Sequence, residues 1–118
     1  MKKSKSILVW YGLNNQGAEK IAKRLAKVRF RIPIGISAAK SNVTPDFVLQ
    51  DSIDDYMKTY TAFADIGDYT TINISCPNTR DGEPFAEKQN LGPLFDAVRA
   101  NHVADRPVYV KLAADLTR

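Results

Sequence analysis

The residues with the clearest chemical potential lie at positions 73–79, which read Asn-Ile-Ser-Cys-Pro-Asn-Thr. They follow a run rich in β-branched and aromatic residues, and Pro77 cannot donate the next hydrogen bond of a sheet, so we expect a strand to end here. A thiolate can act as a base, and amides can bind a neutral ring through paired donors and acceptors. In α/β proteins the carboxyl ends of the strands form the edge where ligands bind. Asn73, Cys76 and Asn78 are therefore candidate site residues.

A further candidate is Lys111, which lies within the largely apolar run 107–112. A lysine that is buried in a strand needs a partner or a ligand, so we interpret Lys111 as a site residue as well. Purely structural interpretations compete with these. Cys76 could serve as a small buried hydrophobe, and Asn73 and Asn78 could serve only as turn formers.

Strands and helices of ten or more residues alternate along the chain. Apolar runs predict strands at 33–37, 69–74 and 107–112, and a short extended segment at 7–11. Between these runs, apolar residues recur at helical spacing. This alternation predicts βαβ units with a parallel sheet, which is an α/β fold.

Each expected helix has a distinguishing feature. The first has an apolar face and, on another face, a basic stripe that we interpret as solvated, formed by Lys20, Lys23, Arg24 and Lys27. The second is expected to start at Thr44-Pro45, a cap followed by a proline at the first helical position. The third contains Pro93, which a helix tolerates in its first turn, and it is expected to end at Asn101-His102.

Length and composition fit a single domain, 1–118, with 44% hydrophobic and 25% charged residues. One cysteine rules out an internal disulfide, and no Cys/His cluster has zinc spacing, so we expect no metal and a reducing, cytoplasmic setting. Nothing in the sequence pairs His102 with Cys76 as a Cys/His hydrolase would require. A closed (β/α)8 barrel needs roughly 250 residues, so a barrel of this kind would be partial, with about three to four βα units.

Taken together, the motifs resemble dihydroorotate dehydrogenase, an FMN-dependent (β/α)8 TIM barrel of pyrimidine biosynthesis. The resemblance extends over nearly the whole chain. Its most specific parts are 73–79 and Val110-Lys111-Leu112-Ala113, which is followed by Asp115-Leu116-Thr117. Three further segments are similar to the family's first loop, the segment after its next strand and the following helix: 12–17, Lys40 with Thr44-Pro45, and Asp54-Asp55-Tyr56.

The resemblance implies a role for each matching residue. Cys76 would be the catalytic base that removes a proton from C5 of dihydroorotate as a hydride leaves C6 for FMN. Asn73, Lys111 and Ser37 would bind the cofactor. Substrate contacts would come from Asn73, Asn78 and three residues of the first loop, Tyr11, Gly12 and Leu13. A nearby cation favours the thiolate, and a lysine beside the flavin stabilises the negative charge that builds on reduction.

Several positions depart from the family pattern. Val9 stands where the family has a substrate-binding asparagine, and Ser37 stands where a flavin-contacting asparagine ends the next strand. Residues 80–83 replace the proline-glycine-leucine of the quinone-using class. Cys76 resembles the soluble class, whereas the surrounding segments resemble the quinone class. Quinone, fumarate and NAD therefore all stay open as electron acceptors.

The leading interpretation is a central fragment of a dihydroorotate dehydrogenase-like enzyme, because the family's other flavin-binding strands would lie outside 1–118. Alone, this fragment is expected to be inactive and to need the missing segments or a partner subunit. The full-length enzyme would be cytoplasmic or peripheral to the cytoplasmic membrane. The alternatives are another FMN-dependent pyrimidine oxidoreductase barrel, or a non-catalytic basic α/β module for RNA or another acidic partner. The leading interpretation expects no nucleic-acid binding, because no aromatic residues interleave the basic stripe.

Overall fold

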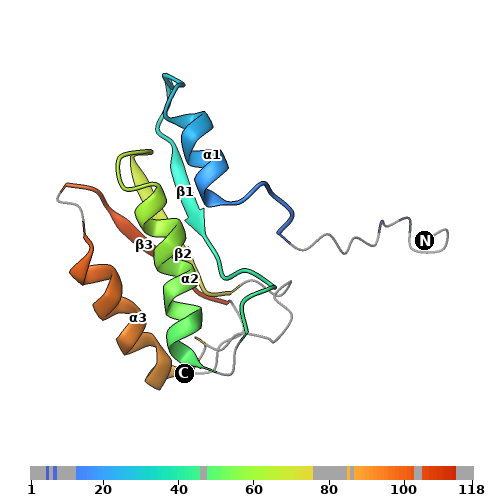
Figure 1. Ribbon diagram of the computed structural model, residues 1–118, viewed down its shortest axis with the longest axis vertical. Coiled ribbons are helices and arrows are strands. Elements are labelled where there is room, and N and C mark those ends of the chain that lie inside the picture. Colours follow the sequence, from blue (N-terminus) through green and yellow to red (C-terminus); the bar gives the residue numbers. More distant parts are fainter. Residues whose placement is uncertain are drawn as a thin grey trace.

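Helices and strands alternate along the chain in the computed structural model, which describes residues 5, 7, 13–45, 48–75, 85, 87–102 and 105–113. The order of the elements is α1 (Ala18–Leu25), β1 (Gly35–Ala38), α2 (Leu49–Ala62), β2 (Tyr69–Asn73), α3 (Lys88–Ala100) and β3 (Val108–Lys111) (Figure 1). This arrangement confirms the predicted α/β class. Of the extended segment expected at 7–11, only Ile7 is described, and it is 89% exposed.

The strands form one parallel sheet in the order β1-β2-β3. In the register, Gly35 pairs with Tyr69, Thr71 with Tyr109, and Asn73 with Lys111. All strands therefore end at the same edge of the sheet. An open parallel sheet with a helix between successive strands is consistent with part of a (β/α)8 barrel.

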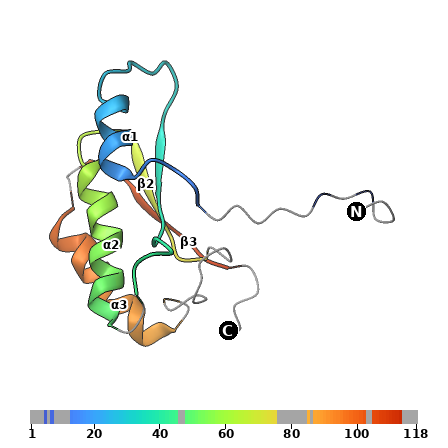
Figure 2. The same cartoon turned by 45° about the vertical axis from the view of Figure 1, so that its right-hand side comes forward.

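The three helices lie on one face of the sheet (Figure 2). Side chains alternate between the two faces along each strand, so Ile36, Ala38 and Ile72 are buried on the helical side. We call the opposite side the open face. It carries six side chains from the three strands, Ser37, Tyr69, Thr71, Asn73, Tyr109 and Lys111. Among the described residues, no helix packs on it.

Two aromatic rings cover part of the open face. Tyr69 and Tyr109 meet edge to face, with their ring centroids 5.6 Å apart. The Tyr69 ring also lies over Gly35, where a Cβ atom would come within 2.2 Å of it. Glycine is thus required at the start of β1 for the tyrosine pair to lie across the sheet.

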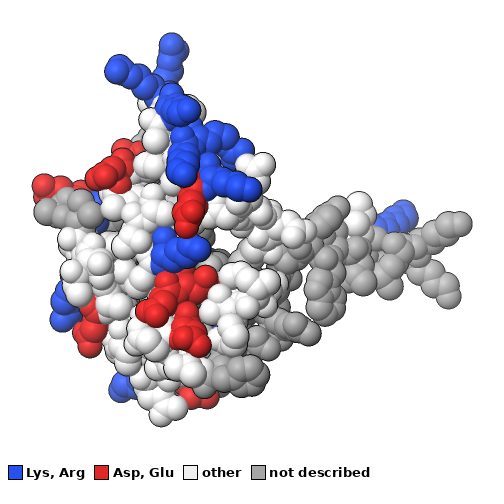
Figure 3. Space-filling model, viewed as in Figure 1, with Lys and Arg blue, Asp and Glu red and all other residues white. Residues whose placement is uncertain are grey.

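The basic stripe on α1 and the turn that follows it is solvated, as predicted. Its members Lys20, Lys23, Arg24 and Lys27 are all exposed, and Figure 3 shows blue side chains gathered over the α1 end of the molecule. One acidic residue of α1, Glu19, lies 3.6 Å from Lys58 of α2. Both partners are largely exposed, so this ion pair adds little stability.

Two expectations about helices were wrong. The second helix was expected to have Pro45 as its first residue. It begins four residues later, at Leu49, with Val48 as its N-cap. Pro93 lies in the second turn of α3, not in the first. Proline is tolerated there because the carbonyl that it leaves without an intrahelical partner belongs to Gln89, and both residues are exposed to water.

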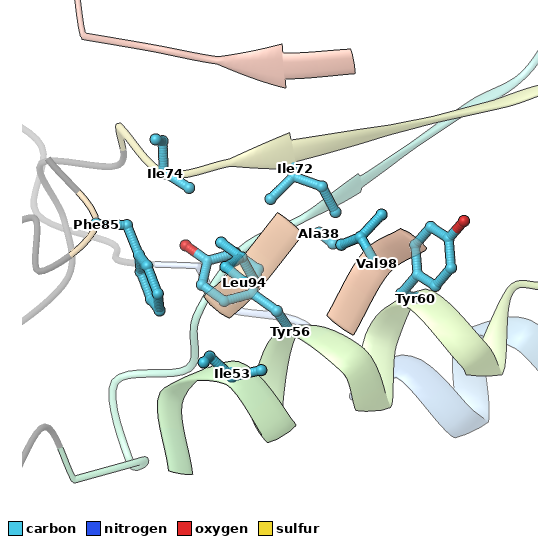
Figure 4. Close-up of a cluster of buried hydrophobic side chains, with 9 residues drawn as sticks. All are labelled: Ala38, Ile53, Tyr56, Tyr60, Ile72, Ile74, Phe85, Leu94 and Val98. Atoms are coloured by element: carbon cyan, nitrogen blue, oxygen red, sulfur yellow. The ribbon is translucent and has the colours of Figure 1, made fainter. Parts of the chain in front are cut away.

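The main core lies between the sheet and helices α2 and α3. It combines Ile53, Tyr56 and Tyr60 of α2, Leu94 and Val98 of α3, Ala38, Ile72 and Ile74 of the strands and their ends, and Phe85 (Figure 4). A smaller cluster joins Ala22 of α1 to Ile36 and Phe63. Because Ala62 of α2 and the adjoining Phe63 pack in this smaller cluster, α2 connects the two clusters.

Candidate functional site

Three candidate residues, Ser37, Asn73 and Lys111, lie on the open face near the carboxyl ends of the strands. Asn73 of β2 and Lys111 of β3 are register partners. Ser37 of β1 pairs with Thr71, which lies two residues before Asn73 in β2. Ser37 and Lys111 are exposed, and Asn73 is half-buried. The expectation that Lys111 is buried was wrong, since the register places its side chain on the uncovered side of the sheet.

A chain of hydrogen bonds connects the two strand ends. Lys111 Nζ donates to Ser75 Oγ over 2.6 Å, and Ser75 Oγ donates to Asn73 Oδ1 over 3.2 Å. Ser75 N also donates to Asn73 Oδ1 over 3.2 Å. These bonds fix the orientation of the Asn73 amide, because its oxygen accepts two hydrogen bonds from Ser75. Within the described part of the chain, its Nδ2 group donates no hydrogen bond and can serve a ligand.

The backbone at this edge is also fixed. Ile74 N donates to Lys111 O over 3.3 Å, which extends the pairing of β2 and β3 by one residue. On the helical side, the Tyr56 hydroxyl donates to Asn73 O over 2.9 Å. The backbone at Asn73 and Ile74 is therefore held by α2 on one side and by β3 on the other.

A hollow of about 900 Å³ lies beside the ends of β1 and β2. Its walls come from α1 and the loop before it, from β1 and the loop after it, from α2 and from Asn73. It brings together Leu13, Ser37 and Asn73, which are three of the predicted site residues. Its volume falls in the range of sites for small molecules and cofactors, about 300–1,000 Å³.

Lys40 is a cation in the wall of the same hollow. It follows β1 and is only 2% exposed, and its Nζ lies 3.4 Å from the Ser41 carbonyl oxygen, to which it donates. Asp55 on α2 accepts a hydrogen bond from Ser41 N. A carboxylate, an amide and a buried ammonium group therefore line one concave surface, which suits a polar ligand that both donates and accepts hydrogen bonds.

Other predicted residues lie outside the described residues: Cys76, Asn78, Tyr11, Gly12 and Val9. Their roles stay predictions. His102 is exposed at the end of α3, as expected, and its Nδ1 lies 3.4 Å from the Tyr60 hydroxyl.

The described residues contain no group of three or more His, Cys, Asp or Glu side chains that could hold a metal ion. None of the described helices has the length and apolar character needed to cross a bilayer.

Sequence reasoning missed three residues that support this edge. Ser75 follows Asn73 by two positions, and the alternation of a strand could have placed it on the same face. The alternation of a strand could not assign Asp55 and Tyr56 to this edge, because both residues lie in a helix. Helical spacing places Tyr56 on an apolar face, but nothing in the sequence identifies the backbone carbonyl that its hydroxyl meets.

Comparisons with known proteins agree with this architecture. A family model described as dihydroorotate dehydrogenase matches residues 1–118. A protein named dihydroorotate dehydrogenase (quinone) from Nostoc sp. is 37% identical over 107 residues, which cover 89% of this chain and 28% of that protein. Proteins of the same name from Gloeobacter violaceus and Rippkaea orientalis are 38% and 35% identical over 105 and 116 residues.

These alignments cover 89% and 95% of this chain, but only 29% and 30% of the Gloeobacter and Rippkaea proteins. The chain thus spans less than a third of the length of these curated relatives. Since the family model matches every residue from 1 to 118, the protein belongs to the dihydroorotate dehydrogenase family.

Proposed function

We propose that this chain supplies one edge of a site that oxidises dihydroorotate to orotate with FMN in de novo pyrimidine biosynthesis. Membership of the family supports the reaction. The observation that carries the proposal is the hydrogen-bonded chain from Lys111 through Ser75 to Asn73, on the open face of the sheet. In this chain of hydrogen bonds a cation and a fixed amide lie at adjacent strand ends, and Ser75, which joins them, directly precedes the predicted base Cys76 in the sequence.

The residues of the open face fit a flavin in chemical character. Lys111 is a cation whose side chain is reachable from solvent, and Asn73 has an amide donor available. Ser37 offers a hydroxyl from the neighbouring strand, although it is shorter than the asparagine that the family has there. When bound, FMN supplies the two-electron acceptor for the hydride that leaves C6 of dihydroorotate.

The chain's own residues have separate tasks in this proposal. Cys76 Sγ accepts the proton from C5 of dihydroorotate, and Asn73 and Asn78 orient the pyrimidine ring through paired hydrogen bonds. Lys111 would favour negative charge on the ring of a bound flavin and on the Cys76 thiol. Leu13, with Tyr11 and Gly12, closes the substrate side, in keeping with the position of Leu13 in the wall of the hollow.

We further propose that the complete enzyme passes its electrons to a quinone. The names of the relatives support this choice over fumarate or NAD. Tight cofactor binding and turnover are expected to need more of the enzyme than residues 1–118, because the chain covers only 28% of the Nostoc protein.

The test is a calorimetric titration of the protein with orotate and with FMN. Asn73→Ala and Lys111→Met should each weaken binding by about fivefold to tenfold, the effect of one hydrogen bond that involves a polar or charged group. Lys88→Met is the matched control, since Lys88 is an exposed lysine on α3 away from the open face. Equal binding by all three variants, or no binding of orotate by the wild-type protein, would refute the proposal. Binding that instead falls steeply with salt would favour the basic module.

A further inference from the structure

Helix α2 contacts both strand ends of the candidate site through two consecutive residues. Asp55 accepts a hydrogen bond from the backbone N–H of Ser41, in the loop after β1. Tyr56 donates its hydroxyl hydrogen to the carbonyl oxygen of Asn73, the last residue of β2, over 2.9 Å. One turn of a single helix is therefore bonded to the loop that follows Ser37 and to the strand end that carries Asn73.

Tyr56 is well fixed for this role. Its side chain is 3% exposed, and its ring meets Phe85 edge to face with centroids 5.4 Å apart. The ring therefore cannot move without opening the main core. The Asn73 backbone is restrained from the helical side by Tyr56, while the Asn73 side chain is restrained from the open face by Ser75.

Asp55 acts on the other side of the same hollow. It is half-buried, lines the hollow together with Ser37 and Asn73, and holds Ser41 directly after the buried Lys40. Within the loop after β1, Thr44 N donates to Ser41 O over 3.2 Å and Val43 N donates to Ser41 Oγ over 3.4 Å, whereas Asp55 bonds this loop to α2. Loss of the Asp55 carboxylate would leave this loop free to shift relative to β2.

We propose that Asp55 and Tyr56 are positioning residues that hold the loop after β1 and the end of β2 in place relative to α2, and hence set the affinity of the site for its ligand. The inference rests on the proposed function in that the ligand is taken to be orotate. Neither residue needs to touch that ligand. Their effect is transmitted through the backbone of Ser41 and Asn73.

The structure provides a matched control in Tyr60, one turn later on α2. Tyr60 is 5% exposed, and its hydroxyl lies 3.4 Å from His102 Nδ1. Figure 4 shows both rings rising from α2, with the Tyr56 hydroxyl beside Phe85 and Ile74 and the Tyr60 hydroxyl at the other end of the cluster. Tyr60→Phe therefore removes a similar buried hydroxyl that has no contact with the site.

The experiment compares Tyr56→Phe and Tyr60→Phe by orotate titration and by amide hydrogen exchange of the unliganded protein. Tyr56→Phe should weaken orotate binding by about threefold to tenfold, the effect of one hydrogen bond, and Tyr60→Phe should leave it unchanged. Exchange at the Ile74 and Ser75 amides should accelerate in Tyr56→Phe alone, because both amides bond at the strand end that Tyr56 restrains.

Asp55 is tested by rescue. Asp55→Ala should weaken orotate binding, whereas Asp55→Asn keeps an oxygen that can accept from Ser41 N and should recover most of the affinity. Equal losses in Tyr56→Phe and Tyr60→Phe would overturn the positioning role. If the wild-type protein binds no orotate, the proposed function fails, and the exchange of the Ile74 and Ser75 amides still decides whether Tyr56 fixes the strand end.

Discussion

At the scale of single residues, Ser75 is the connection on which the candidate site depends. It is only 4% exposed and bonds both Lys111 and Asn73. Replacing it by alanine removes both bonds and leaves the Asn73 oxygen with fewer donors. We expect Ser75→Ala to lower the free energy of unfolding by about 1–3 kcal/mol, as measured by urea denaturation.

A double-mutant cycle separates this connection from a general loss of packing. Lys111→Met alone and Ser75→Ala alone remove the same hydrogen bond. The double variant should therefore lose about 0.5–1.5 kcal/mol less free energy of unfolding than the sum of the two single losses. Strictly additive effects would show that the bond between Lys111 and Ser75 contributes nothing to stability.

The types of the site residues were readable from sequence, but their relations were not. The heptapeptide 73–79 and Lys111 identify the family because they are local in the chain. Burial of Lys111 was predicted wrongly, because a short apolar run does not show which face of a strand is covered. The Tyr56 bond to Asn73 O joins residues 17 positions apart, and such a contact depends on how α2 packs on the sheet.

At the scale of elements, strands were predictable to within two residues and helix starts were less so. The expected strand at 69–74 is Tyr69–Asn73, and that at 107–112 is Val108–Lys111. These runs are bounded by proline, glycine or polar residues that end a strand. The start of α2 was misplaced because Thr44-Pro45 has the composition of a cap, while α2 begins at Leu49 after Val48 in an extended conformation.

Pro93 in α3 leads to a prediction about helix stability. It occupies the second turn, where it removes a hydrogen bond to the Gln89 carbonyl. Pro93→Ala should therefore raise the free energy of unfolding by about 1–3 kcal/mol, measured as a shift in the urea midpoint. Pro45→Ala is the control, because Pro45 is exposed and lies outside any helix, and it should shift the midpoint far less. A stabilisation no larger than that of Pro45→Ala would contradict this account of α3.

At the scale of the whole molecule, the sheet is open on one face and at both edges in the described part of the chain. The strand order leaves one side of β1 and one side of β3 without a paired strand. Close to the β3 edge, Tyr109 is 56% exposed and Leu112 is 54% exposed. In a closed barrel of the family, further strands would pair with such edges and the open face would line the interior.

Unpaired edges with apolar neighbours are templates for association. We therefore expect the protein to self-associate with rising concentration in sedimentation velocity experiments. Tyr109→Lys places a charge on the edge strand and the open face, and should shift the protein toward monomer. Val43→Lys is the matched control, because Val43 is 88% exposed in a loop outside the sheet and adds the same charge elsewhere. Far-UV circular dichroism verifies that both variants keep their fold. If Val43→Lys dissociates the protein as well as Tyr109→Lys does, net charge and not the β3 edge controls association. A wild-type protein that is monomeric at all concentrations would show that these edges are not sites of association.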